Sequence, residues 1–178
     1  LRGEGILLFE LGRAAQGQAN YAAAEAHYQS ALGLTPRVGY RGLESILQFQ
    51  LGDVLRLQGK YAQALAMMQQ ALASFREIGE HMDEATALAY LGHLADQLGD
   101  DARAYAWLGD ALRVSREQGA REPELDALVY LARHCLRLVQ RGLFDLSRVR
   151  GYSRGFALTT SLILGIFTRF SSVLSVLL

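Results

Sequence analysis

The segment YAAAEAHYQSAL, residues 21–32, recurs as YAQALAMMQQAL in residues 61–72 and again as DARAYAWLGDAL in residues 101–112. In each copy the fourth and eleventh positions are alanine and the twelfth is leucine. A period of roughly 20 to 50 residues is typical of chains built from stacked structural repeats. The spacing therefore predicts a repeat architecture with a unit of 40 residues.

The same period extends beyond these segments. Glutamate recurs near the start of each unit, a Leu-Gly pair follows, and glycine closes the unit. These positions are Glu4, Glu44, Glu84 and Glu124, then Leu11-Gly12, Leu51-Gly52 and Leu91-Gly92, and finally Gly39, Gly79 and Gly119. The array then consists of repeats 1–40, 41–80 and 81–120 and a partial repeat, 121–142.

Each unit contains two helical segments. The first, such as residues 83–100 (DEATALAYLGHLADQLGD), places apolar residues at helical spacing and ends in a Gly-Asp break. The second, such as residues 61–79 (YAQALAMMQQALASFREIG), is also helical and ends at glycine, the usual residue after a helix. We predict an all-α fold of antiparallel helix hairpins, with the repeated glycines and alanines at the helix crossings. A larger side chain at such a crossing costs about 1–3 kcal/mol.

At these positions the sequence resembles the tetratricopeptide repeat family. The first copy carries the family pattern at Leu11, Gly12, Tyr21, Ala24, Tyr28, Ala31 and Pro36. The resemblance implies a right-handed α-solenoid whose first helices line a concave groove that binds a peptide or a partner helix. The unit is longer than the usual one of about 34 residues, and is similar to repeats of bacterial ATP-dependent transcription activators and kinesin light chains.

Composition limits the chemistry available. The chain has 51% apolar and 20% charged residues and a formal net charge of zero, which argues against direct nucleic-acid binding. Cys135 is the single cysteine, so neither an internal disulfide nor a cysteine-based zinc site is expected. The four histidines form no His-x3-His pair, and the chain has no phosphate-binding loop and no nucleophile elbow. We therefore predict no enzyme, no cofactor and no metal site.

Two local clusters have simpler interpretations. His134 and Cys135 are adjacent, and neighbouring residues on a helix point about 100° apart, which favours a buried cysteine over a thiol–imidazole pair. Asp96, Asp100 and Asp101 lack the spacing of a calcium-binding loop, so this segment is interpreted as the turn of a helix hairpin.

The predicted binding surface is the exposed side of the first helices. Its positions vary in kind from copy to copy, whereas the packing positions repeat. Arginine and aromatic side chains there suit a peptide partner, because aromatics supply contact area and arginine supplies forked hydrogen bonds. A solvated face with weak ion pairs is the competing interpretation. The site residues are Phe9, Glu10, Arg13, Phe49, Asp53, Arg56, Tyr90, His93, Asp96, Tyr130 and Arg133.

Three functions remain open. The first is a non-catalytic protein–protein interaction scaffold that binds a peptide or partner helix. The second is the effector-sensing arm of a larger bacterial ATP-dependent transcriptional regulator, consistent with a chain that starts at Leu1 rather than at methionine. The third is a membrane-tethered assembly factor. Cytoplasmic localisation is expected, with membrane contact only through residues 156–178, and the end of the array is a candidate surface for self-association.

Residues 143–178 depart from the repeat. Their net charge is +3, against −3 for residues 1–142, and the stretch 156–178 contains one charged residue, Arg169. A capping helix, translation in a shifted frame and a membrane anchor all fit this composition. The anchor has the required length, but Arg169 lies in mid-span at a cost of about 2.5–3.5 kcal/mol. The three interpretations stay open.

Overall fold

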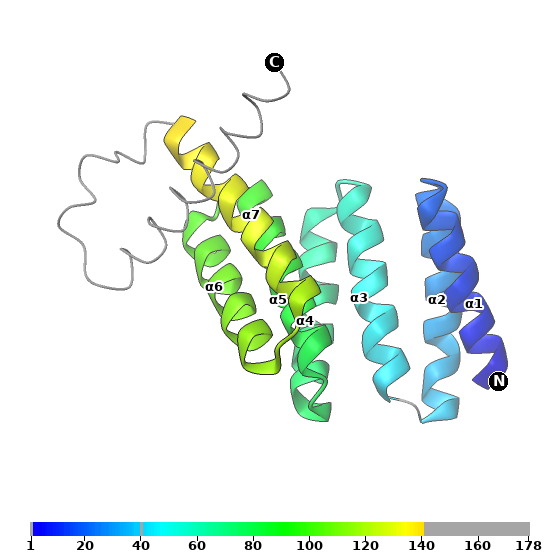
Figure 1. Ribbon diagram of the computed structural model, residues 1–178. Coiled ribbons are helices and arrows are strands. Elements are labelled where there is room, and N and C mark those ends of the chain that lie inside the picture. Colours follow the sequence, from blue (N-terminus) through cyan, green and yellow to red (C-terminus); the bar gives the residue numbers. More distant parts are fainter. Residues whose placement is uncertain (1, 40, 141–178) are drawn as a thin grey trace, which may run out of the picture. The chain divides into compact units, whose positions relative to one another are not determined.

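The computed structural model describes residues 2–39 and 41–140, which form helices joined by short turns (Figure 1). The helices are α1 (Arg2–Gly17), α2 (Tyr21–Val38), α3 (Arg41–Leu57), α4 (Tyr61–Ile78), α5 (His81–Leu98), α6 (Asp101–Gln118) and α7 (Arg121–Gln140). The chain divides into two units, Leu1–His134 and Cys135–Leu178, and the packing described below lies within the first. The predicted apolar segment 143–178 lies outside the described residues.

The helices pair in chain order as hairpins. Helix α1 packs on α2, α3 on α4 and α5 on α6, and the hairpins are joined by α2 against α3 and by α4 against α5 (Figure 1). We call α1, α3, α5 and α7 the first helices, and α2, α4 and α6 the second helices. The predicted all-α solenoid of helix hairpins is confirmed for residues 2–39 and 41–140, and each second helix has 18 residues.

Small residues bring the two helices of each hairpin close together. A Cβ atom built on Gly92 lies 2.5 Å from Leu108 Cγ, and one on Gly52 lies 2.7 Å from Met68 Cγ. Gly12 meets the ring of Tyr28 in the same way. The alanines at the fourth and eleventh positions of the repeated segment are fully buried: Ala24, Ala64, Ala104, Ala31, Ala71 and Ala111. The predicted role of these residues at the helix crossings is confirmed.

The turns within the hairpins need a left-handed backbone residue. Gly59 and Gly99 supply it in the second and third hairpins with φ of 77° and 78°. The first hairpin has Ala19 at the equivalent position with φ of 57°, a conformation that costs a residue with a Cβ roughly 1–2 kcal/mol. The Gly-Asp segment is a hairpin turn as predicted, because Asp100 caps α6 by accepting a hydrogen bond from the backbone N–H of Arg103.

The repeated glutamates join neighbouring hairpins. Arg76 at the end of α4 donates to Glu84 near the start of α5 at 2.8 Å, and Arg116 repeats this contact with Glu124 at 2.8 Å. Burial acts to raise the pKa of Glu84. Hydrogen bonds from Arg76 and from His81 act in the opposite direction and outweigh burial, so the pKa of Glu84 lies below its usual value. These bridges give a structural role to Glu84 and Glu124, two of the four recurring glutamates.

The first junction is held at its opposite edge. Glu25 near the start of α2 accepts hydrogen bonds from Gln58 at 2.9 Å and from Lys60 at 3.0 Å, just beyond the end of α3. The first junction therefore carries this contact at the opposite end of the helices from the Arg76–Glu84 and Arg116–Glu124 bridges.

One apolar stripe on α1 is uncovered. Leu7 and Leu11 are 61% and 43% exposed, whereas Leu47 and Leu51 at the equivalent positions of α3 are 0% and 6% exposed. Self-association through this end of the array stays a prediction. Among the helices of the described residues, none combines the length and the hydropathy needed to cross a bilayer.

A pair of glycine variants tests the close approach. Gly92→Ala places a methyl group against Leu108, whose backbone nitrogen lies 3.2 Å from the new Cβ, and we expect a loss of about 1–3 kcal/mol. Gly109→Ala on α6 meets nothing within 4 Å and is expected to stabilise by about 0.5–1 kcal/mol, as alanine does in a helix. Urea unfolding measures both, and equal midpoint shifts would contradict the assigned role of Gly92.

Candidate functional site

The predicted site residues all lie on the first helices, but they differ in exposure. Three are exposed, six are half-buried and two are buried. The exposed residues are Glu10, Arg13 and Arg133; the half-buried ones are Phe9, Phe49, Arg56, Tyr90, His93 and Tyr130; the buried ones are Asp53 and Asp96. We call the nine exposed and half-buried residues the first-helix face.

Aromatic rings link three of the first helices. Phe49 on α3 meets Tyr90 on α5 edge to face at 5.2 Å between ring centroids. Tyr90 in turn meets Tyr130 on α7 at 5.9 Å, and His93 stacks on Tyr130 at 4.4 Å with nearly parallel planes. Edge-to-face and stacked pairs are favourable arrangements of aromatic rings. The structure thus joins four of the predicted site residues in one continuous group.

A polar chain runs beside the rings. The Tyr28 hydroxyl donates to Gln16 Oε1 at 3.0 Å, and Gln16 Nε2 donates to Asp53 Oδ2 at 2.8 Å. Arg56 pairs with Asp53 at 2.7 Å and lies over the ring of Tyr90, with Cζ 5.9 Å from its centroid. Burial raises the pKa of Tyr28 to about 12, so this hydroxyl stays a donor. Asp53 therefore orients Arg56 from below the face.

The predicted residues of α1 form a local group. Arg13 lies over the ring of Phe9 at 5.8 Å and pairs with Glu10 at 3.5 Å. Phe9 also approaches Tyr28, with 6.1 Å between centroids. Because Glu10 and Arg13 are both largely exposed, their ion pair contributes about 0–1 kcal/mol and leaves both groups accessible to a partner.

Asp96 lies inside the protein and below the first-helix face. Its side chain is 2% exposed, and His134 Nδ1 lies 2.6 Å from Asp96 Oδ1. Asp101 Oδ1 approaches the same nitrogen at 3.9 Å. Burial lowers the pKa of His134, and the nearby Asp101 carboxylate opposes that shift. Cys135 is buried, as predicted, and burial raises the pKa of its thiol.

Sequence reasoning missed the grouping of Asp96, Asp101 and His134. A search for histidine pairs and calcium loops considers neighbours along the chain, whereas His134 is 38 residues from Asp96. The available signal was the repeat itself, because each of the three residues differs in kind from its counterparts in other copies.

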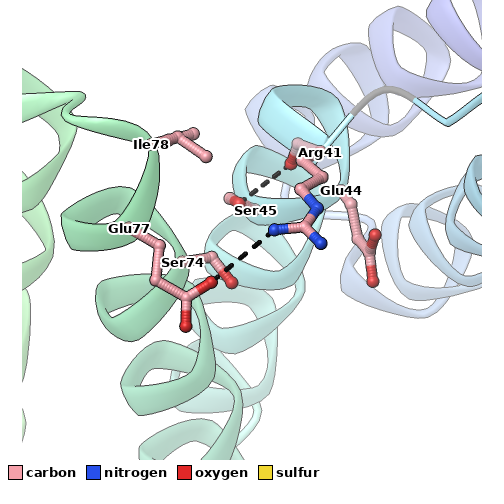
Figure 2. Close-up of a pocket in the computed structure, with 6 residues that line it drawn as sticks. All are labelled: Arg41, Glu44, Ser45, Ser74, Glu77 and Ile78. Carbon is pink, nitrogen blue, oxygen red and sulfur yellow. Dashed lines mark hydrogen bonds and ion pairs between the residues drawn. The ribbon is translucent and has the colours of Figure 1, made fainter.

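A separate hollow of about 280 Å³ lies between α3 and α4 (Figure 2). It is lined by Arg41, Glu44, Ser45, Ser74, Glu77 and Ile78. Arg41 reaches across it to Glu77 at 3.8 Å, and the Ser45 hydroxyl donates to the backbone oxygen of Arg41. The two charged side chains are 77% and 71% exposed, so this ion pair is weak. Its lining includes no residue of the first-helix face.

The sequence model of the Tetratricopeptide repeat family matches residues 43–117, which lie within the second and third units. The resemblance of these repeats to that family is thereby confirmed. Proteins of this family bind protein partners and are typically non-catalytic. No curated protein matches the chain.

Solved structures share the fold at 18% sequence identity. A signal transduction ATPase with numerous domains and a tetratricopeptide repeat sensor, from Pyrococcus horikoshii, has a TM-score of 0.69 over 98% of this chain and 25% of its own. A Rap protein complexed with competence and sporulation factor has a TM-score of 0.60 over 74% and 34%. Aspartyl phosphate phosphatase F from Bacillus subtilis has a TM-score of 0.59 over 69% and 30%. The chain spans about a quarter to a third of each of these proteins.

A double-mutant cycle tests the Asp53–Arg56 pair. Asp53→Ala leaves a guanidinium that is 13% exposed without its carboxylate, and we expect a loss of about 3–5 kcal/mol. Adding Arg56→Ala removes the unpaired charge, so the double variant should lose less than the sum of the single changes. The exposed Glu10–Arg13 pair is the control, with an expected coupling below about 1 kcal/mol. Equal coupling energies for the two pairs would contradict this assignment.

Proposed function

We propose that the chain binds an extended peptide or a partner helix along the first-helix face. The observation that carries this proposal is the continuous aromatic group made by Phe49, Tyr90, His93 and Tyr130 across three successive first helices. A ligand that follows these rings contacts several repeats at once. The binding surface is therefore longer than a single repeat.

The side chains of this face suit a protein ligand. Tyr90 and Tyr130 are half-buried, so they offer ring area without the entropy cost of fixing a flexible side chain. Arg56 is already oriented by Asp53, which lowers the cost of using its remaining donors. Arg13 and Arg133 are exposed at two different helices and supply positive charge for the carboxylates of a partner.

Peptide selection on the immobilised chain identifies a ligand for measurement. For a selected peptide we expect Tyr130→Ala to weaken binding about 30-fold or more, as loss of an aromatic hot spot does. The double variant Arg13→Glu and Arg133→Glu is also expected to weaken peptide binding, because it slows association with the peptide. Fluorescence anisotropy of the labelled peptide gives the Kd of each variant.

Matched controls lie on the second helices. Tyr105→Ala and the pair Arg103→Glu and Arg113→Glu change exposed residues of α6 and should leave the Kd unchanged. If the α6 variants weaken binding as much as the first-helix variants, the peptide binds elsewhere and the proposal fails.

A second candidate is the effector-sensing arm of a larger bacterial ATP-dependent transcriptional regulator. Its support is the Pyrococcus horikoshii ATPase, of which this chain spans a quarter and whose description names a repeat sensor. We expect such an arm to gain thermal stability from a small-molecule effector, by about 2.7 kcal/mol at 100 times its Kd. A panel of metabolites that leaves the Tm unchanged, while selected peptides raise it, favours the peptide scaffold.

The third hypothesis, a membrane-tethered assembly factor, depends on residues 156–178, which lie outside the described residues. Cytoplasmic localisation likewise stays an expectation from the sequence.

A further inference from the structure

Three ionisable side chains from three helices meet at one place in the fold. They are Asp96 near the end of α5, Asp101 at the start of α6, and His134 on α7. Two of them depart from the repeat, since other copies hold Tyr21 and Tyr61 in place of Asp101, and Ala14, Val54 and Leu94 in place of His134. The position of Asp96 differs in every copy.

The geometry brings three ligand atoms together. His134 Nδ1 lies 2.6 Å from Asp96 Oδ1 and 3.9 Å from Asp101 Oδ1, and one ligand atom from each residue lies within 4.8 Å of the others. Ligands about 2.0–2.2 Å from a tetrahedral metal ion are about 3.3–3.6 Å apart. The two distances bracket this value, so small side-chain rotations place an ion among the three groups.

A buried hydrogen bond alone does not account for Asp101. Asp96 is sufficient to pair with the imidazole, and 3.9 Å exceeds hydrogen-bond distance. A second carboxylate next to the first adds repulsion between like charges, which a cation placed between them offsets. The repeat offers tyrosine at this position, so Asp101 is not required by the packing.

Burial and access also fit an ion. The side chains of Asp96 and His134 are 2% exposed, whereas that of Asp101 is 36% exposed. Asp101 is therefore the member of the group that meets solvent. Residues fixed on helices hold a metal more precisely than residues on loops do.

We propose that Asp96, Asp101 and His134 bind a divalent transition-metal ion, with Zn²⁺ as the preferred occupant. One imidazole and two carboxylates suit Zn²⁺ or Mn²⁺, whereas Ca²⁺ and Mg²⁺ favour an all-oxygen set. The ion binds Nδ1 of the neutral imidazole, and the single N–H of the His134 ring then lies on Nε2. Because the ligands come from α5, α6 and α7, the ion links the third hairpin to the helix that follows it.

Calorimetry and thermal unfolding of the metal-free, tag-free chain test the site. We expect one Zn²⁺ per chain, and a rise in Tm of about 5–10 °C at a Zn²⁺ concentration about 100 times the Kd. Mg²⁺ and Ca²⁺ at the same concentration should produce no comparable shift.

Asp101→Tyr is the decisive variant, because it restores the residue that Tyr21 and Tyr61 hold in the other copies. It should keep the helical circular dichroism spectrum and lose both the bound Zn²⁺ and the Tm shift. Asp101→Asn is a second variant of the same group, with less change in size. His27→Gln on α2 is the control for adventitious histidine binding and should leave the shift intact. Failure of the wild-type chain to bind Zn²⁺, or retention of the Tm shift in both Asp101 variants, overturns the proposal.

Discussion

The close approach of the two helices in each hairpin is the constraint on which the structure depends. Gly52 and Gly92 leave no room for a Cβ, and Met68 and Leu108 fill the space above them. Interiors packed at this density tolerate neither a larger nor a smaller side chain without cost. Small residues recur every 40 residues in the sequence because each hairpin has the same helix crossing.

The same constraint leaves the first-helix face free to vary. Once the crossing positions fix the helix spacing, residues such as Tyr90 and Tyr130 contact their counterparts on the next first helix across a set distance. We therefore expect substitutions of the exposed residues of this face to leave the helix crossings unchanged. Asp53 marks the boundary between the two classes of position, because it is buried yet supports Arg56 on the face.

The sequence was sufficient for the helices, hairpins and crossings, because these follow from the period, from helical spacing and from glycine at helix ends. The predicted site residues all lie on the first helices. The sequence did not predict how far each of these side chains is buried, and Asp53 and Asp96 are in fact buried. Burial depends on the rotation of each helix about its axis, which is set by packing against the neighbouring hairpins. The contact of Asp96 with His134 was equally hidden, since it joins helices that are separated by a full repeat.

The polar contacts between hairpins have a mechanical consequence. Glu25 with Lys60 holds the first junction at one edge, and Arg76 with Glu84 holds the second junction at the other. The contact of Arg116 with Glu124 lies at the same edge as that of Arg76 with Glu84. The Glu25–Lys60 and Arg76–Glu84 contacts each include a partly exposed cation, so both are screened by salt. We therefore expect the polar coupling between neighbouring hairpins to weaken as the ionic strength rises.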